Sequence, residues 1–209
     1  MAIQFDYSTR RISEILSETV HTIPIEGMTL RQLLGQLDDQ GLMLFCIFLT
    51  IPFLLPIQIP DLSTVFCLPV AFIAVGLTMN RVPTFPAWLM ERRIPSARLV
   101  VILEHGARLF ARIEQIVRPR WSILTHSAAI KRVTGLLLLL AAGLLMLPLI
   151  LPFSNFFPTL AILLLAVGIL QRDGLFILGG YLAVLGTVVY FVGVALLAIH
   201  GAHSIIGML

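Results

Sequence analysis

The sequence predicts an all-α integral membrane protein, and three observations lead to that class. Of the 209 residues, 58% are hydrophobic and only 12% are charged, which is unlike a soluble globular domain. The mean hydropathy of +1.00 comes from a few long apolar runs, each comparable to the thickness of a hydrocarbon layer. Most of these runs lie in pairs, and prolines mark the break within each pair. We therefore expect one membrane domain over residues 1–209, built from helical hairpins.

Five apolar runs define the predicted helices. The first two are separated only by residues 58–61 and the next two only by residues 154–155, so each pair forms a helical hairpin. As a helix the last run would reach about 39 Å, which exceeds the roughly 30 Å hydrocarbon core, whereas the run at 156–170 would reach about 22 Å. The last run is expected to cross the membrane, and each hairpin either spans it or is re-entrant. The runs are residues 41–57, 62–79, 134–153, 156–170 and 174–199.

The two hairpins resemble each other. IPFLLP at 51–56 parallels LPLILP at 147–152, and Ala-Val-Gly recurs at 74–76 and 166–168. Leucine-rich segments can align by chance, but the shared Pro-x-x-x-Pro, followed at a matching distance by Ala-Val-Gly, favours an internal repeat. Prolines remove backbone donors and bend helices. Those expected to break the hairpins are Pro52, Pro56, Pro60, Pro148, Pro152 and Pro158.

Basic residues predict the orientation. Residues 81–132 contain ten of the 14 Lys and Arg residues and three acids, and such a segment is retained on the cytoplasmic side. Because a hairpin returns the chain to the side it left, the N-terminal region is also expected in the cytoplasm and the C-terminus in the periplasm. The expected parts are a cytoplasmic region at 1–40, hairpins at 41–80 and 133–173, the basic linker at 81–132 and a transmembrane helix at 174–200.

An amphipathic helix is predicted before each hairpin. Thr29 to Gln32 has the form of a capping box and begins the first, at 29–37. In the second, at 96–117, apolar residues form a narrow stripe and basic residues another face. This helix either lies along the membrane surface with its arginines near anionic headgroups or packs on the hairpins with a solvated basic face. The stripe is Leu99, Leu103, Gly106, Phe110, Ile113 and Val117; the basic face is Arg98, His105, Arg108 and Arg112; the i,i+4 pairs are Glu104 with Arg108 and Glu114 with Arg118.

Polar residues at the two hairpin tips are the candidate substrate or ion site. Broken segments at corresponding positions of two repeats indicate a site near the membrane midplane, and the helix that follows each break directs free N–H groups toward it. Asp61 is the only acid between Gly41 and Arg81. It is either a helix cap in a water-facing loop or a buried carboxyl that binds a proton, ion or substrate. The other candidates are Gln58, Ser63, Thr64, Ser154, Asn155 and Thr159.

The remaining features indicate packing rather than chemistry. Gly179, Gly186 and Gly193 recur at sevenfold spacing in the last run, as small residues do where helices approach closely. No nucleotide-binding or catalytic motif is present, so we expect no enzyme activity, cofactor, metal or nucleic-acid partner. Five apolar runs in 209 residues can hardly enclose a pathway alone, and a homo-oligomer in the lipid bilayer is therefore expected.

Four stretches carry a family resemblance that covers about residues 25–200. They are TLRQLLGQLDDQG (29–41), IPFLLPIQIPDLSTVFCLPV (51–70), RVPTFPAWLMERRIP (81–95) and LLPFSNFFPTLAILLLAVGILQRDG (150–174). Together they resemble the ExoD (exopolysaccharide synthesis) family of bacterial membrane proteins. The resemblance implies an inner-membrane protein with a role in exopolysaccharide production, envelope integrity and tolerance of alkaline conditions, and it implies no catalytic residues.

Two functions are therefore expected. The first is support of exopolysaccharide synthesis or export through transport of a small solute, ion or lipid at the paired hairpin tips. The alternative is a non-transporting accessory or scaffold subunit that binds the envelope polysaccharide machinery through the amphipathic helix at 96–117.

Overall fold

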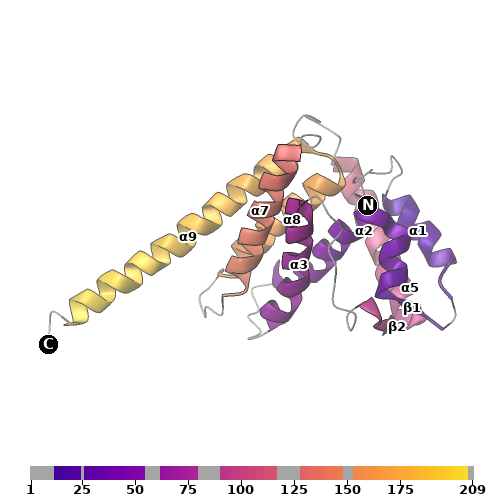
Figure 1. The fold of residues 1–209 in the computed structure, drawn as a ribbon, viewed down its shortest axis with the longest axis horizontal. Coiled ribbons are helices and arrows are strands. Elements are labelled where there is room, and N and C mark those ends of the chain that lie inside the picture. Colours follow the sequence, from indigo (N-terminus) through magenta and orange to yellow (C-terminus); the bar gives the residue numbers. More distant parts are fainter. Residues whose placement is uncertain are drawn as a thin grey trace.

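The computed structural model shows a chain that is mostly helical, which confirms the predicted class at that level (Figure 1). It describes residues 12–24, 26–54, 62–79, 90–116, 128–147 and 153–206. The elements are α1 (Ile12–His21), β1 (Met28–Thr29), α2 (Leu30–Thr50), the 3₁₀ helix η1 (Ile51–Leu54), α3 (Leu62–Met79), β2 (Arg93–Ile94), α5 (Ser96–Ile116), α7 (Ala128–Leu145), α8 (Phe156–Leu170) and α9 (Gly174–Ile206).

Four apolar helices form a closed ring at the centre of the molecule. In the order α2, α3, α7 and α8 each helix contacts the next, and α8 contacts α2 again. α3 and α7 approach closely at Gly135, where an added Cβ would lie 2.8 Å from the backbone nitrogen of Thr78. Most of α8 is buried, from Pro158 to Leu170. The ring is therefore the core of the fold, with α8 its most enclosed member.

A sharp corner joins α8 to α9. Arg172 has the left-handed value φ 53°, its N–H donates to Ile169 O (3.3 Å), and the N–H of Asp173 donates to Gly168 O (3.0 Å). This pattern is a Schellman motif, in which glycine is the usual left-handed residue. Asp173 then begins the next helix, because its Oδ1 accepts the N–H of Leu175 at 2.9 Å. The corner ends one helix and caps the other within three residues.

Asp173→Ala is expected to lower the free energy of unfolding by about 1–2 kcal/mol, the usual cost of losing a helix cap. The carboxyl is almost completely buried, so water cannot readily replace it as the acceptor of the Leu175 N–H. Thermal unfolding of the detergent-solubilised protein measures the loss. Asp173→Asn keeps an acceptor oxygen and is the control, and equal melting temperatures for the two variants would contradict the capping role.

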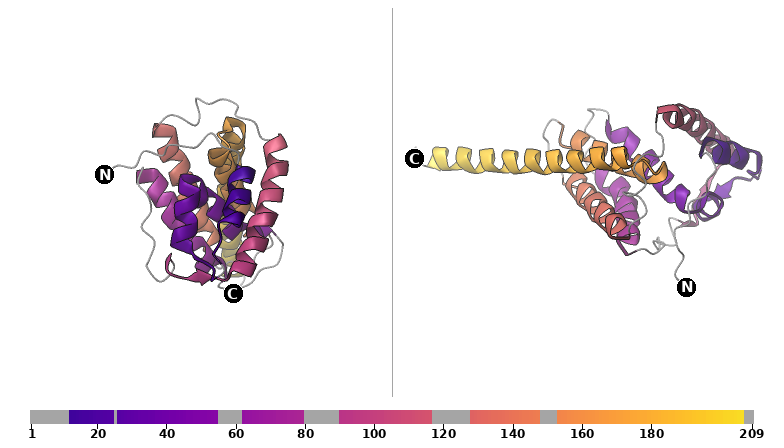
Figure 2. Two further views of the ribbon diagram at one scale, coloured as in Figure 1. Left: turned by 90° about the vertical axis from the view of Figure 1, so that its right-hand side faces the viewer. Right: turned by 90° about the horizontal axis from the view of Figure 1, so that it is seen from above.

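The N-terminal helix and the amphipathic helix form a second layer. α1 packs against α5, at the end of the molecule opposite the C-terminus (Figures 1 and 2). A two-residue antiparallel ribbon, Met28 with Ile94 and Thr29 with Arg93, joins the beginnings of α2 and α5. Gly27 precedes the ribbon with φ 87°, and an added Cβ would collide with Ile94 O. No helix at α1 was predicted from the sequence.

The first amphipathic segment and the first apolar run are one continuous helix. The predicted capping box is confirmed at its start, since Gln32 N–H donates to Thr29 Oγ1 (3.3 Å) and Thr29 N–H donates to Gln32 Oε1 (3.0 Å). The helix then runs without a break to Thr50. The separate helix predicted at 29–37 is therefore corrected to the first turns of α2. The same helix then continues into the ring.

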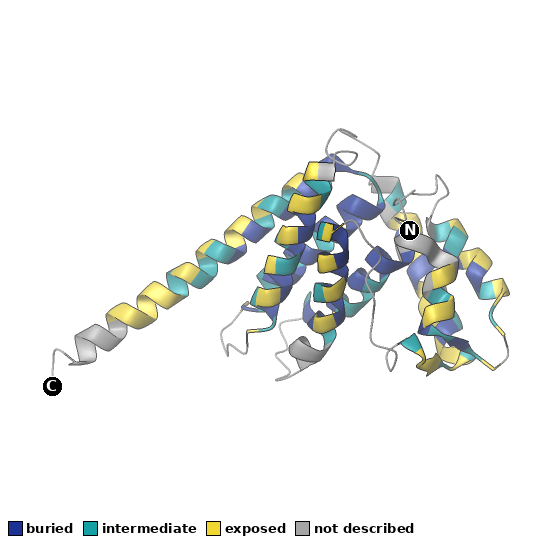
Figure 3. Cartoon of the chain, viewed as in Figure 1, coloured by how far each residue is buried: buried dark blue, intermediate teal, exposed yellow. Residues whose placement is uncertain are grey.

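One helix in the described part of the chain, Gly174–His200, is long and apolar enough to cross a membrane, with a mean hydropathy of 2.6. Its C-terminal half projects away from all other described elements (Figures 1 and 2). Apolar side chains on α3 and α7 are also exposed in stripes at helical spacing (Figure 3). These stripes are Leu68, Phe72, Val75 and Met79 on α3, and Val133, Leu136 and Leu140 on α7.

Candidate functional site

The described ends of the two hairpins lie at the same end of the ring. α3 begins and α7 ends at the lower end in Figure 1, and η1, which follows α2, contacts α8. Pro52 lies in η1, where the chain changes from α-helix to 3₁₀ helix. Ser63 and Thr64 lie in the first turn of α3. The predicted tip residues Pro56, Gln58, Pro60, Asp61, Pro148 and Pro152 lie outside the described residues, and their binding role stays a prediction.

The second tip is described from Phe153 onward, and the hydroxyl of Thr159 bonds to its own helix. Asn155 is at the N-cap of α8, but its side chain makes no capping hydrogen bond. Its carbonyl oxygen accepts from Thr159 Oγ1 at 2.6 Å, and Thr159 is fully buried. Ser154 is buried as well. Pro158 lies in the first turn of α8, where no intrahelical donor is required, so it begins this helix rather than breaking it.

An aromatic cluster that was not predicted from the sequence lies at the start of α8. Phe153 has φ 65°, a conformation that non-glycine residues rarely adopt. Its ring lies 6.2 Å from that of Phe156 and 6.4 Å from that of Phe157, and Phe157 lies 5.2 Å from Tyr190 of α9. The cluster therefore connects the tip to the middle of the long apolar helix. In the sequence, the adjacent Phe156 and Phe157 before Pro158 were the feature from which this cluster could have been predicted.

Glycines in the second half of the chain set the contact between α8 and α9. A Cβ at Gly168 would lie 2.8 Å from the backbone nitrogen of Ile177, and one at Gly180 would collide with Leu165. By contrast, a Cβ at Gly179 would meet only Leu164, at 3.9 Å, and one at Gly186 or Gly193 would meet nothing within 4 Å. Within this chain the close approach is therefore at Gly168 and Gly180. That Gly179, Gly186 and Gly193 pack against a helix of another molecule stays a prediction.

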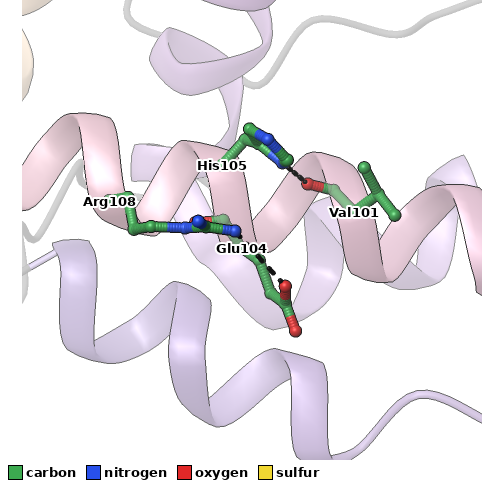
Figure 4. Close-up of polar contacts among 4 residues, drawn as sticks. All are labelled: Val101, Glu104, His105 and Arg108. Carbon is green, nitrogen blue, oxygen red and sulfur yellow. Dashed lines mark hydrogen bonds and ion pairs between the residues drawn. The ribbon is translucent and has the colours of Figure 1, made fainter.

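The exposed face of α5 is the best-described candidate surface. The predicted stripe is buried where the structure describes it, at Leu99, Leu103, Gly106 and Phe110. Arg98, Arg108 and Arg112 are exposed. The predicted pair is confirmed, since Arg108 Nη2 lies 3.6 Å from Glu104 Oε2 (Figure 4). The helix thus packs on the protein and presents a basic face to its surroundings.

Two residues of α5 make polar contacts that the sequence spacing did not predict. Glu114 accepts hydrogen bonds from Ser13 N (3.1 Å) and Ser13 Oγ (2.6 Å), which places a carboxylate at the N-terminus of α1. Sequence spacing had paired Glu114 with Arg118, which lies outside the described residues. His105 Nδ1 lies 2.7 Å from Val101 O, so this ring nitrogen carries a proton and bonds to its own helix (Figure 4).

An open groove lies between α5 and the end of α2. Its volume is about 380 Å³, and it is lined by Phe48, Ile51, Val101, Ile102, His105 and Gly106. The lining is almost entirely apolar. An added Cβ at Gly106 would lie 2.8 Å from Cζ of Phe48, so the glycine lets the two walls meet at the base of the groove. Among the described residues, no three or more of His, Cys, Asp and Glu gather in a metal-binding group.

These observations define a helical protein with a ring-shaped apolar core, one helix able to cross a membrane and a basic surface helix. Residues 12–193 match the family model described as "Exopolysaccharide synthesis, ExoD". The chain therefore belongs to the ExoD family. The match begins at α1 and so includes the N-terminal helix that lies before the expected stretch of likeness.

Two curated proteins are similar to the chain. Protein ExoD of Rhizobium meliloti (strain 1021) is 42% identical over 192 residues, which cover 91% of this chain and 80% of that protein. An uncharacterized protein of Synechocystis sp., slr1875, is 25% identical over 183 residues, which cover 87% of this chain and 85% of that protein. No solved structure matches the chain.

Proposed function

We propose that this protein supports exopolysaccharide synthesis or export from within the bacterial inner membrane, by moving a small solute, ion or lipid at the hairpin tips. Membership of the ExoD family supports the involvement in exopolysaccharide synthesis. The exposed apolar stripes of α3, α7 and α9 support the membrane location, because soluble monomers rarely expose apolar patches of such extent. In this proposal the basic linker at 81–132 faces the cytoplasm and the C-terminus the periplasm.

A single observation carries the transport step: the described ends of both hairpins lie at one end of the same ring. Two helix breaks that converge in this way resemble the broken helices around which transporters build their sites. The apolar stretches in three of the four hairpin helices are also short, since Gly41–Leu54, Phe66–Met79 and Phe156–Leu170 each have fewer than 18 residues. Short helices favour tips that turn back within the membrane rather than cross it. No catalytic residue or cofactor is assigned.

Asp61→Asn is expected to abolish exopolysaccharide production in a strain that lacks the chromosomal gene, because an amide cannot bind and release a proton or pair with a cation. Extracellular polysaccharide is measured after complementation at equal membrane abundance of the protein. Glu14→Gln, on the exposed face of α1, is the matched control and is expected to restore production fully. Full production with Asp61→Asn would contradict a carboxylate-dependent transport step.

Single cysteines at Gln58, Asp61, Ser154 and Asn155, in a protein without Cys46 and Cys67, test the re-entrant tips directly. Slow labelling by membrane-impermeant maleimide from either side, or labelling that changes with pH, is the expected result. Rapid labelling from the periplasm alone would mean that the tips are ordinary loops, and the proposal of a site within the membrane would then be rejected.

The accessory role is the second candidate, and the exposed arginines of α5 favour it. A scaffold subunit would tolerate Asp61→Asn but would be disabled by Arg108→Glu combined with Arg112→Glu, since reversed charge at a docking face repels the original partner. The two functions therefore predict opposite results in the same complementation assay.

A further inference from the structure

We propose that the groove between α5 and the end of α2 binds an acyl chain of an anionic phospholipid, whose phosphate group is bound by the arginines of α5. The proposal requires the membrane location given above but not transport at the hairpin tips. It assigns a ligand class to a groove beside α5 that the transport proposal leaves unused.

The shape and lining of the groove fit a hydrocarbon chain. Its volume of about 380 Å³ lies within the range of small-molecule sites, and it is open along one side rather than enclosed. Val101 is 53% exposed and Ile102 is 44% exposed, so two large apolar side chains of α5 lack a cover within the described chain. The only polar side chain in the lining, that of His105, already bonds through Nδ1 to Val101 O.

The position of the groove favours lipid over a water-soluble ligand. One wall is formed by Phe48 and Ile51, which belong to the apolar run of the first hairpin. The other wall belongs to the amphipathic helix. The groove therefore has apolar hairpin residues on one side and, on the other, an amphipathic helix of the kind that lies at the headgroup boundary. A chain that enters there would cover the exposed apolar side chains of both walls.

Charge on α5 identifies the headgroup. Residues 98, 101, 105, 108 and 112 follow one another at spacings of three and four, so they share one face of the helix. Arginines stand at positions 98, 108 and 112 of this face, before and after the groove residues Val101 and His105. The guanidinium group donates to phosphate in a bidentate geometry. Glu104 pairs with Arg108 alone among the described contacts, which leaves a net positive face beside the groove.

The test uses the purified full chain in detergent, incubated with equal amounts of dioleoyl phosphatidylglycerol and dioleoyl phosphatidylcholine. Native mass spectrometry measures the lipid that remains bound. The wild-type protein is expected to retain phosphatidylglycerol in preference, by roughly fivefold for each arginine that contacts the phosphate. Equal retention of the two lipids would overturn the proposal, because it would remove the role of charge.

Variants separate the chain site from the phosphate site. Ile102→Trp fills the groove and is expected to lower the retention of both lipids, whereas Leu136→Trp, on the exposed stripe of α7, is expected to leave it unchanged. Arg98→Gln with Arg108→Gln should abolish the preference for phosphatidylglycerol, and the exposed pair Arg31→Gln with Arg93→Gln should preserve it. Unchanged retention in Ile102→Trp, or equal loss in Leu136→Trp, would overturn the proposal.

Two further measurements keep the outcome clear. If Ile102→Trp lowers the melting temperature, Val101→Gln replaces it, because it makes the lining polar at an exposed position. Millimolar glycerol 3-phosphate should leave bound phosphatidylglycerol in place, and complete displacement would mean that the headgroup alone is recognised, which contradicts a chain in the groove. None of these readouts involves transport, so failure here and failure of the transport proposal are distinguishable.

Discussion

Gly168→Leu is expected to lower the free energy of unfolding by about 3 kcal/mol, at the upper end of the usual cost of overpacking. A Cβ at this position would lie 2.8 Å from the backbone nitrogen of Ile177 and 3.1 Å from the backbone carbon of Phe176. Backbone atoms cannot rotate away as a side chain can, so α8 and α9 must separate. The expected result is a lower melting temperature of the detergent-solubilised protein.

Gly186→Leu is the matched control. It lies in α9, where an added Cβ meets nothing within 4 Å of this chain. Leucine is favoured over glycine in a helix interior by up to about 1 kcal/mol, so this variant is expected to be as stable as the wild type or slightly more stable. Equal loss of stability in the two variants would contradict this prediction, because it would show that the cost does not come from the contact between Gly168 and the backbone of α9.

Phe110→Ala is expected to have the largest effect in the surface layer, about 3–5 kcal/mol, as for other buried phenylalanines. Phe110 is the largest of the fully buried side chains that the structure describes, and α5, which carries it, is the helix against which α1 packs. Amide hydrogen exchange in α1 should accelerate strongly, because the substitution removes part of the α5 surface on which α1 packs. Exchange in the buried residues of α8 should change much less.

Phe72→Ala provides the comparison for this change. It removes the same side chain from the exposed stripe of α3, where Phe72 is 38% exposed. The expected cost is about 1 kcal/mol or less, as for other partly exposed positions. Equal destabilisation by the two variants would show that the stripe on α3 packs against protein rather than against detergent or lipid.

Local sequence patterns predicted local structure well. In α5 the spacing of Leu99, Leu103 and Phe110 is enough to predict the apolar stripe, and these side chains are buried as expected. The capping box at Thr29 and the ion pair between Glu104 and Arg108 depend on residues three and four apart. Such interactions form between neighbours on one helix, so the sequence contains all the information that they require.

Contacts between distant segments could not be predicted in the same way. The ribbon pairs Met28 with Ile94, and two residues per strand leave no alternating pattern to detect. Glu114 has a neighbour at the correct helical spacing, and nothing local indicates that its carboxylate bonds to Ser13 instead. α1 was not predicted although Leu16 and Thr19 share a buried face, because this ten-residue helix contains no long apolar run.

The binding role of the hairpin tips stays a prediction, and the packing around the second tip was predicted only in part. Spacing alone cannot tell which face of α9 meets α8, and the contact uses Gly180 rather than the adjacent Gly179. Thr159 was proposed as a ligand, but its hydroxyl bonds to its own helix at Asn155 O, as is common for threonine within helices. The groove beside α5 depends on Phe48 and Ile51 of another helix, and no pattern within α5 could reveal that second wall.

The hydrogen bonds between Ser13 and Glu114 also set an order of events during synthesis. The two residues are 101 positions apart, and a ribosome that adds about 5–20 residues per second needs roughly 5–20 s to cover that distance. Throughout this interval α1 has been made but α5, the surface that buries Leu16, has not. α1 therefore docks on α5 only after the first hairpin has been translated.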